Sequence, residues 1–393
     1  MSITLPGPTL GVVGGGQLGR MMGEAAAPLG VDIVVLDPTP DCPASPVVSD
    51  QIVADFGDEE GIHELARRVD ALTFEIELAD PDVLAAASAK HDVPVHPDPD
   101  TLRTIQDKLV QNEMLADAGI AVPDFAAVAT AGGLERVAEE FGGVMLKARE
   151  GGYDGRGNVP VEDPADAADA LDAVGGNAMA ERFVDFEREI AVMGVRGADG
   201  ETRTYPVTET VHREEILRES VSPARIDETT DDAAEAVARD VLDALDGRGV
   251  FGIELFETRD GEILVNEIAP RPHNSGHWTI EGARTSQFEN HVRAVLGWPL
   301  GPTELVSPAV TANVLGDVAE TQIATLRGVD TVLAAPDADL HWYGKGDVRP
   351  LRKMGHLTVT AGDGDADAGG AVDRDALLSQ ARELRDGLTF RDA

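Results

Sequence analysis

The sequence predicts an α/β protein of two or three domains, ending in a part that is rich in strands. A β-branched strand runs into a glycine turn and a helix, and a second strand follows, which makes a βαβ unit over residues 9–37. Strand and helix patterns then alternate as far as residue 298, as in sheets covered by helices. Between residues 299 and 363 strand patterns predominate. A chain of 393 residues is long enough to bury a core in each domain.

The charge of the chain is extreme. The formal net charge is -40 at pH 7, the acids are spread along the whole sequence, and only five of the 32 basic residues are lysines. This pattern fits a folded halophilic protein in molar salt, where the screening length falls to ~3 Å. An acidic surface for a basic partner is the alternative, but it predicts clustered acids. Nucleic-acid binding is excluded because the sequence has no basic stripe.

Cysteine content and hydropathy bear on the compartment. Cys42 is the single cysteine, so an internal disulfide cannot form, and a reducing compartment is expected. No apolar run approaches the ~20 residues of a membrane span, and the first residues lack a signal-peptide pattern. The sequence therefore predicts a cytoplasmic protein with no membrane partner.

The first strand, residues 9–14, leads into a glycine turn, a helix to about residue 27, and a strand at 31–36. Gly14, Gly16 and Gly19 have the G-x-G-x-x-G spacing, and Asp37 lies about twenty residues on, as in a dinucleotide site. NAD binding is therefore one interpretation. The other is a turn whose amides and helix N-terminus hold any phosphate.

A strand at 71–76, a helix at 80–90 and a strand at 93–96 complete the first domain, which the Pro/Asp-rich residues 96–100 close. Glu75 and Glu77 stand at the end of the first of these strands. Open parallel sheets bind ligands at that edge, although solvated carboxylates at a strand end are the plainer interpretation.

Two lysines mark the next region. A helix at 101–117 carries Lys108, and strand 125–128, a helix at 133–141 and strand 144–148 follow, with Lys147 inside the last strand. A lysine among apolar strand residues is costly to bury unless it meets an anion.

Residues 149–157 hold four glycines and two arginines, a composition typical of a flap whose amides and guanidinium groups surround phosphates. A flexible hairpin tip would explain the glycines but not Lys147 or Arg156. The loop is not a Walker A motif.

The central region contributes further polar positions. Strand 178–184 carries Glu181, and strands 187–196 and 202–211 pair around a turn, with Glu189 on the first and His212 just after the second. A lone histidine such as His212 is more often structural than catalytic. A helix is expected at 231–246.

Strands 250–257 and 262–268 form the hairpin around which the chain is organised. They present Glu254 and Glu267, with Asn266 beside the second carboxylate. Hard oxygen ligands side by side suit Mg²⁺, whereas the plainer interpretation is a solvated surface hairpin. A loop dense in donors follows, and it could hold a small anion; these residues are Arg271, His273, Asn274, Ser275 and His277.

After a helix at 285–297, strands are expected at 309–314, 331–334, 339–343 and 356–361. Cationic residues then cluster in a local anion site: His341, Lys345, Arg349, Arg352, Lys353 and His356. Residues 363–372 have the composition of a flexible linker, and the last helix, 373–388, is expected to be peripheral.

Five motifs together resemble those of the N5-carboxyaminoimidazole ribonucleotide synthetase family, the ATPase subunit of phosphoribosylaminoimidazole carboxylase, within the ATP-grasp superfamily. They are GGGQLGRM (14–21), TFEIE (73–77), KAREGGYDGRG (147–157), NEIAPRPHNSGHW (266–278) and HWYGKGDVRPLRKMGH (341–356). They occur in the family's order between residues 9 and 361. The last two are specific to this branch, whereas the lysines and the glutamate pair are shared across the superfamily. VTETVHREEIL (207–217) is more acidic than the usual pattern, and the tail after 363 lies outside the motifs.

The resemblance implies an ATP-grasp fold with an N-terminal Rossmann-like (pre-ATP-grasp) domain at 1–100, an ATP-grasp domain at 101–298 and a C-terminal β-rich domain at 299–363. The flap lobe would span about 125–185, and a linker and helix would occupy 364–393. It also implies an ATP-dependent carbon–nitrogen ligase of purine biosynthesis. ATP, bicarbonate and 5-aminoimidazole ribonucleotide would be substrates, with Mg²⁺ or alternatively Mn²⁺ bound. Carboxyphosphate would be the intermediate. A homodimer and a hand-off of product to a mutase are further implications.

Residue roles carry over by position. Bicarbonate would be framed by Arg271, His273, Asn274 and Lys345. Mg²⁺ would be held by Glu254 and Glu267. The nucleotide would meet Lys108, Lys147, Gly152, Tyr153, Asp154, Gly155, Arg156, Gly157, Glu181, Arg182, Phe183, Val184, Glu189, His212, Asn266 and Glu267. The ribonucleotide would meet Gly15, Gly16, Gln17, Leu18, Gly19, Glu75, Tyr153, Asp154, Arg156, Arg352 and Lys353.

Three alternatives remain at this level. The first is the formate-using glycinamide ribonucleotide transformylase, which is built on the same plan. The second, an NAD-dependent dehydrogenase, rests on the glycine motif alone and leaves Lys147 and the glutamate pair unexplained. The third is a nucleotide-binding protein without turnover.

Overall fold

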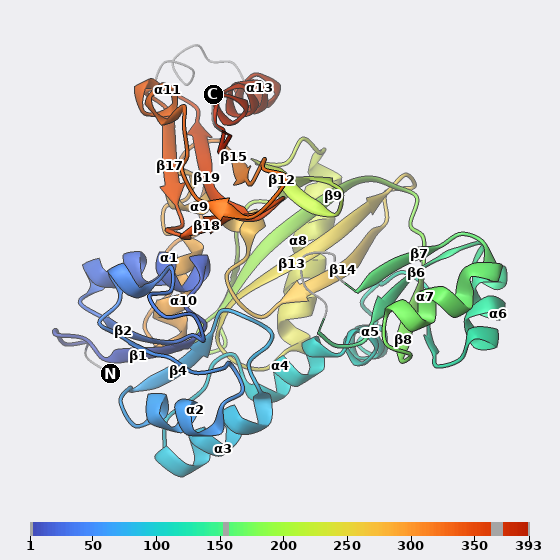
Figure 1. Ribbon diagram of the computed structural model, residues 1–393, viewed down its shortest axis with the longest axis horizontal. Coiled ribbons are helices and arrows are strands. Elements are labelled where there is room, and N and C mark those ends of the chain that lie inside the picture. Colours follow the sequence, from blue (N-terminus) through green and yellow to red (C-terminus); the bar gives the residue numbers. More distant parts are fainter. Residues whose placement is uncertain (1–2, 152–156, 363–371, 392–393) are drawn as a thin grey trace.

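The computed structural model describes residues 3–151, 157–362 and 372–391. Its N-terminal part is a parallel sheet in the order β3-β2-β1-β4, with helices on both sides (Figure 1). The expected βαβ unit is confirmed, whereas residues 93–96 make only a single bridge, Leu72 to Val95. The elements are β1 (Thr9–Val13), α1 (Gln17–Ala26), β2 (Asp32–Leu36), β3 (Asp50–Ile52), α2 (Glu59–Ala66), β4 (Ala71–Phe74) and α3 (Pro81–His91).

The order of the strands identifies where an open parallel sheet of this kind would bind a ligand, between β1 and β4. The chain leaves β1 toward β2 on one side, while β4 lies on the other, so the direction of winding reverses between these two strands. Such a reversal leaves a crevice at the carboxyl ends of the strands. The glycine turn follows β1 and Glu75 follows β4, so both stand at this edge.

The helix expected at 101–117 is two helices, α4 (Pro99–Gln106) and α5 (Lys108–Asp117). Asp107 interrupts them with an extended backbone, φ -96° and ψ 105°, and its side chain accepts hydrogen bonds from the amides of Leu109 and Val110. An aspartate at this position competes for the backbone donors and starts a new helix. Lys108 is consequently the first residue of α5.

A small antiparallel sheet with two helices forms a lobe at one side of the molecule (Figure 1). Its strand order is β5-β8-β6-β7, so β6 lies between β8 and β7. This central place explains why Lys147, the fourth residue of β6, is buried. The elements are β5 (Phe125–Val128), α6 (Ala131–Phe141), β6 (Val144–Ala148), β7 (Asn158–Val161), α7 (Ala167–Ala173) and β8 (Ala178–Arg182).

The largest sheet has nine strands in the order β14-β13-β9-β11-β12-β15-β19-β17, with β10 paired to β9. The sheet continues from the acidic hairpin into the C-terminal region, because β12 pairs with β15. The elements are β9 (Phe186–Arg196), β10 (Thr202–Thr204), β11 (Thr208–Arg213), β12 (Ile216–Ser222), α8 (Glu228–Ala244), β13 (Gly249–Thr258), β14 (Ile263–Ala269), α10 (Gln287–Val295), β15 (Ala309–Leu315), β17 (Ala338–Trp342) and β19 (Lys353–Thr360).

Alternate side chains of β13 point to opposite faces of the sheet, one facing the core and the other facing the candidate site. Phe251, Ile253 and Leu255 are buried in one cluster with residues of α8. Successive side chains of a strand point to opposite faces, so Glu254 lies on the face away from α8. The hairpin expected from the sequence, β13 and β14, is thereby confirmed together with the direction of its carboxylate.

Two expectations for the C-terminal region are wrong. Residues 331–334 are not a strand but part of α11 (Val329–Ala334), in which Val332 is buried in the cluster that holds Leu377 and Leu388. The β-branched residues that favour a strand are overridden by this packing. The last helix, α13 (Arg374–Asp386), is not peripheral, because Arg382 and Arg385 pair with the buried carboxylate of Glu219.

The expected linker at 363–372 lies outside the described residues except for Val372. Among the helices that the structure describes, none combines the length and the apolar character that crossing a membrane requires.

Candidate active site

Glu254 and Glu267 face each other across β13 and β14. The register pairs Glu254 with Glu267 and then Leu255 with Val265, so Asn266 is the extra residue of a β-bulge. A bulge redirects the side chains beside it. Here Asn266 accepts a hydrogen bond from Lys147 and Glu267 accepts one from Lys108, so the bulge turns two neighbouring side chains toward the two lysines.

The two carboxylates have opposite pKa shifts. Burial, with the nearby charges of Glu267 and Glu189, raises the pKa of Glu254 to about 6, although His212 and Lys353 act against this. Burial also acts to raise the pKa of Glu267, but Lys108, Lys147 and Arg271 outweigh it and lower that pKa. Lys108 Nζ lies 2.5 Å from Glu267 Oε1. The hairpin therefore presents one stabilised carboxylate beside one that would gain from a further positive charge.

Lys147 meets the anion that its burial requires. Its Nζ lies 2.6 Å from Glu181 Oε1 on β8 and 3.3 Å from Asn266 Oδ1. Lys147 and Glu181 are both buried. The carboxylate of Glu181 and the amide oxygen of Asn266 thus hold the Lys147 side chain at the hairpin, where it could contact a phosphate.

The end of β6 is tied to the start of α5. Arg149 forms a bidentate pair with Asp107, with Nε 3.0 Å and 3.1 Å from the two carboxylate oxygens, and the Lys108 amide donates to the Arg149 carbonyl at 2.9 Å. These bonds hold Lys108 and Lys147 in a fixed relation.

The expected glycine flap is described only in part. The Gly157 carbonyl accepts from the Ala148 amide at 2.8 Å. The flap residues expected to contact the nucleotide or the ribonucleotide, Gly152, Tyr153, Asp154, Gly155 and Arg156, lie outside the described residues.

The loop after β14 supplies the donors for a small anion. Arg271 Nη2 lies 2.8 Å from Glu77 Oε1, which links this loop to the N-terminal sheet edge. His273 Nδ1 lies 2.9 Å from Ser275 Oγ and 3.7 Å from Glu254 Oε1. Asn274 donates to Asn313 Oδ1 at 3.2 Å, and its own buried Oδ1 has no hydrogen-bond partner among the described residues.

The glycine turn closes over a carboxylate of the chain itself. Glu75 accepts hydrogen bonds from the amides of Gly16 and Gly19, and a Cβ at Gly16 would lie 2.8 Å from Glu75 Oε1. Burial raises the pKa of Glu75 to about 7, against the effect of these amides and of Arg271. The Gly15 amide donates to Asp37 Oδ2 at 2.9 Å. Protein carboxylates thus accept from these amides, so any phosphate bound at the turn, of a dinucleotide or of a ribonucleotide, would have to displace them.

Leu18 and Gln17 are the remaining residues of the glycine turn that are expected to bind the ribonucleotide. Leu18 is buried in the N-terminal core with Met21 and Met22. Gln17 is the first residue of α1.

His212 and Glu189 form a pair beside Glu254. His212 Nδ1 lies 3.0 Å from Glu189 Oε2. Although burial lowers the pKa of His212, its bond to Glu189 and the charge of Glu254 raise it overall.

Residues 181–184, which are expected to contact the adenine, differ in their surroundings. Arg182 pairs with Asp124 at 2.9 Å and lies over the ring of Phe141, whereas Phe183 is 39% exposed. Val184 follows β8 and is partly buried. The Arg182 side chain is therefore held by its own lobe.

The C-terminal cations do not all converge on one anion site. Arg352 binds the carbonyl and side chain of Asp347, and Lys345 donates to the Lys353 carbonyl at 2.6 Å. His356 is fully buried, and burial holds its pKa well below the ordinary value, so it carries no charge. The expectation that His356 adds to a cationic cluster is wrong. His341 instead pairs with Glu281 at 2.6 Å.

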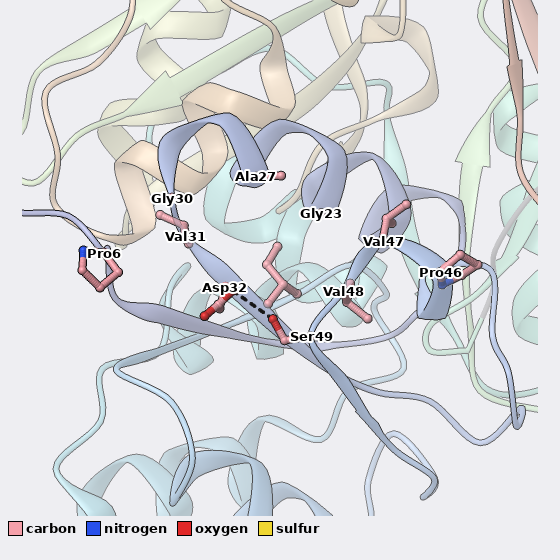
Figure 2. Close-up of a pocket in the computed structure, with 11 residues that line it drawn as sticks. Pro6, Gly23, Ala27, Gly30, Val31, Asp32, Pro46, Val47, Val48 and Ser49 are labelled. Atoms are coloured by element: carbon pink, nitrogen blue, oxygen red, sulfur yellow. Dashed lines mark hydrogen bonds between the residues drawn. The ribbon is translucent and has the colours of Figure 1, made fainter.

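A hollow of about 420 Å³ lies elsewhere, between α1, β2 and the segment before β3 (Figure 2). Gly23, Ala27 and Val47 line it, and the Ser49 hydroxyl donates to Asp32 at 3.0 Å on its rim. None of the expected site residues lines this hollow, so it is not the site that the sequence predicts.

Three residues that position the site were missed from the sequence. Asp107 anchors Arg149, Asn313 pairs with Asn274, and Gln287 bonds the backbone of His273. The sequence holds no signal for Gln287, because its burial at the start of α10 follows from tertiary packing. The other two lie in segments of ordinary composition.

Three domain families match the chain. The ribonucleotide synthetase preATP-grasp domain matches residues 8–106, the ATP-grasp domain matches residues 113–288, and the phosphoribosylaminoimidazole carboxylase C-terminal domain matches residues 309–367.

Curated relatives fall into two lengths. The N5-carboxyaminoimidazole ribonucleotide synthase of Pseudomonas aeruginosa is 42% identical over 90% of this chain and 95% of its own length. The phosphoribosylaminoimidazole carboxylases of Ogataea methanolica and Schizosaccharomyces pombe are 40% and 41% identical. The chain spans only 66% and 64% of the length of these two proteins.

Solved structures agree with the fold. The N5-carboxyaminoimidazole ribonucleotide synthetase of Thermotoga maritima has a TM-score of 0.86 and 42% identity, covering 97% of this chain and 99% of its own. The Aspergillus clavatus N5-carboxyaminoimidazole synthase in complex with ADP and 5-aminoimidazole ribonucleotide has a TM-score of 0.86 and 34% identity, over 96% of this chain and 98% of its own. With the lysines, the facing glutamates and the donor loop in place, the chain belongs to the N5-carboxyaminoimidazole ribonucleotide synthase family of ATP-grasp enzymes.

Proposed function

We propose that this protein carboxylates 5-aminoimidazole ribonucleotide with bicarbonate and ATP, giving N5-carboxyaminoimidazole ribonucleotide, ADP and phosphate in purine (IMP) biosynthesis. The observation that carries the proposal is the meeting of Lys108 and Lys147 with the bulged end of β14, where Asn266 and Glu267 stand opposite Glu254. Phosphoryl transfer needs positioned charge more than covalent chemistry from the protein, and this arrangement supplies it.

ATP would bind between the small lobe and the hairpin. Lys108 and Lys147 would contact its phosphates and residues 181–184 its adenine. Glu189 would hold the ribose, with His212 beside it. Gly157 and the flap residues before it would cover the phosphates. Because Lys108 and Lys147 are bound to Glu267, Glu181 and Asn266, phosphate binding would exchange some of these contacts for contacts to ATP.

The facing glutamates fit a divalent cation. Within the described residues no group of three or more His, Cys, Asp or Glu side chains could hold a metal ion alone. Two carboxylates completed by substrate phosphates are the usual Mg²⁺ environment. Burial raises the pKa of Glu254, and the charges of Glu267 and Glu189 add to this, so a cation beside Glu254 would favour its ionised form. Glu254 and Glu267 would hold Mg²⁺, or alternatively Mn²⁺. When bound, the ion neutralises charge on the phosphates and orients them.

Bicarbonate would bind at Arg271, His273, Asn274 and Lys345. It is a weak nucleophile and an anion, and two unit charges ~4 Å apart at an effective dielectric of ~20 repel by ~4 kcal/mol. Lys147 and Arg271 can offset this repulsion, because both lie near Glu267. Attack of a bicarbonate oxygen on the γ-phosphorus forms carboxyphosphate and releases ADP. Excluding water protects this intermediate.

The ribonucleotide would bind at the edge between β1 and β4, facing Arg271. Glu75, Arg352, Lys353, the Gly15–Gly19 turn and the flap residues Tyr153, Asp154 and Arg156 would hold it. Its exocyclic amine attacks the carboxyl carbon of carboxyphosphate, or of CO₂ released from it, so a C–N bond forms and phosphate leaves. A carboxylate or histidine at this junction accepts the amine proton.

A formate-using transformylase is the closest alternative. The match of residues 309–367 to the carboxylase C-terminal domain favours the carboxylase interpretation. The test measures ADP formation in molar KCl with either amine acceptor and either one-carbon acid. Dependence on bicarbonate and 5-aminoimidazole ribonucleotide is expected. Dependence on formate and glycinamide ribonucleotide, or no turnover with tight NADH binding, would contradict the proposal.

We also propose a cellular location, a halophilic character, an oligomeric state and a fate of the product. The single cysteine, Cys42, and the ATP requirement support a cytoplasmic location, and the charge of -40 supports a halophilic protein. The family resemblance supports a homodimer, which light scattering in molar KCl would test. The longer fungal carboxylases support a hand-off of the carbamate product to a separate mutase.

A further inference from the structure

Gln287 binds both backbone groups of one residue in the donor loop. The His273 amide donates to Gln287 Oε1 at 2.9 Å, and Gln287 Nε2 donates to the His273 carbonyl at 2.7 Å. An amide N–H can only donate and a carbonyl can only accept, so the orientation of the Gln287 side chain is fixed. Gln287 is fully buried at the start of α10, so solvent does not compete for these bonds.

The same amide nitrogen also reaches the other end of the loop. Gln287 Nε2 lies 3.3 Å from His277 Nδ1, so His277 accepts there. The backbone N–H of Gln287 donates to Thr279 Oγ1 at 3.0 Å, and this bond fixes the start of α10. One side chain therefore connects His273 to His277 across the residues between them.

Two glycines leave room for this arrangement. A Cβ at Gly276 would lie 2.7 Å from Gln287 Oε1, and a Cβ at Gly252 would lie 2.4 Å from the Cβ of His273. Both contacts are closer than real Cβ atoms approach other heavy atoms. The loop thus has little space in which to shift, and Gln287 defines where its backbone lies.

We propose that Gln287 is a positioning residue that sets the orientation of His273 and Asn274 toward bicarbonate. The inference rests on the proposed function, because it assigns these two side chains to the bicarbonate site. Reactive groups must be held within ~0.5 Å of their productive places, and a ~1 Å displacement can cost ~100-fold in rate. Gln287 itself contacts the loop backbone, not the reactants.

The same helix offers a matched control. Asn290 is also fully buried and makes the same kind of paired bonds, to Gly301: the Gly301 amide donates to Oδ1 at 2.7 Å, and Nδ2 donates to the Gly301 carbonyl at 3.2 Å. Gly301 lies beyond α10 and outside the donor loop. A substitution of Asn290 therefore removes a comparable set of buried hydrogen bonds but leaves the hydrogen bonds to His273 in place.

The kinetic test compares Gln287→Met with Asn290→Leu, two apolar replacements of similar size, in molar KCl. Gln287→Met is expected to raise KM for bicarbonate on the order of 10- to 100-fold while KM for ATP stays within about twofold. Asn290→Leu is expected to lower Tm but to leave both KM values within about twofold. An unchanged KM for bicarbonate in Gln287→Met, or equal rises in all KM values in both variants, would overturn the proposal.

Hydrogen exchange gives a readout that needs no turnover. The His273 amide is expected to exchange faster in Gln287→Met than in the wild-type protein or in Asn290→Leu. Should the wild-type protein show no bicarbonate-dependent ADP formation, the proposed function fails, and exchange alone decides the part played by Gln287. Equal exchange of the His273 amide in all three proteins would overturn it.

Discussion

Glu254 and Glu267 lie directly opposite each other in the β13–β14 register, yet the pKa of the first is raised and that of the second is lowered. At Glu254 the effect of burial prevails, whereas at Glu267 the charges of Lys108, Lys147 and Arg271 outweigh it. A divalent ion at the hairpin would stabilise the ionised form of Glu254, which burial disfavours.

The pKa of Glu254 predicts how Mg²⁺ affinity varies with pH. Glu254 gains a proton as the pH falls through about 6, and the protonated acid is a poor metal ligand, so the affinity for Mg²⁺ weakens in acid. Between pH 7 and pH 5 the apparent Mg²⁺ constant, measured from ADP formation at fixed ATP, should weaken about tenfold. Glu262→Gln, at an exposed position of the same hairpin, should keep this profile. The same profile in Glu254→Gln would contradict the assignment.

Lys147→Ala is expected to abolish ADP formation while the protein remains folded. Removing a charge aimed at the transferred phosphate should lower kcat at least about 100-fold. Since Lys147 pairs with the buried Glu181, the substitution also leaves a carboxylate without its cation. The double variant Lys147→Met, Glu181→Gln should recover thermal stability but not activity. Near-normal turnover in a folded Lys147 variant would count against the phosphate role.

Gly16→Ala should weaken ribonucleotide binding. The new Cβ would lie 2.8 Å from Glu75 Oε1 and would displace a carboxylate that the Gly16 and Gly19 amides hold. KM for 5-aminoimidazole ribonucleotide should rise by about tenfold, and KM for ATP should not change. Gly132→Ala in α6, where no atom lies within 4 Å of the new Cβ, serves as the control. A selective rise in KM for ATP would show that the turn serves the nucleotide instead.

Arg385→Met should destabilise the protein without affecting catalysis. Arg385 and Arg382 neutralise the fully buried carboxylate of Glu219, and loss of one partner of a buried ion pair costs about 3 kcal/mol. Chemical unfolding should show this loss. Arg259→Met removes an exposed pair with Asp185 and should cost less than about 1 kcal/mol.

Glu219 also predicts the acid limit of stability. Burial acts to raise its pKa, but Arg382 and Arg385 hold that pKa below the ordinary value of 4.5. A depressed pKa in the folded state adds stability above pH 4.5, and this stability is lost as the pH falls through the folded-state pKa. Arg385→Met should therefore shift acid unfolding to higher pH. An unchanged acid-unfolding midpoint would contradict this account of α13.

The sequence predicted the parts of the site that follow from local pattern. Alternation along β13 and β14 placed Glu254 and Glu267 together, and the burial of Lys147 followed from its apolar neighbours in β6. The pairing of Lys147 with Glu181 could not be predicted, because it depends on which strand lies beside β6.

Other features depend on contacts between distant segments. Asp107 caps α5 locally, but its bond to Arg149, forty-two residues away, could not be predicted, and the docking of α13 reflects the buried Glu219. Residues 331–334 have a strand composition but pack as a helix against the C-terminal core. Here tertiary packing outweighs local preference.

The most direct test is a crystal structure with Mg²⁺ and a non-hydrolysable ATP analogue, grown in molar KCl. The account predicts that the triphosphate contacts Lys108 and Lys147 and that the metal bridges it to Glu254 and Glu267. A triphosphate bound at the glycine turn beside Glu75, or a metal ligated away from the β13–β14 hairpin, would contradict it.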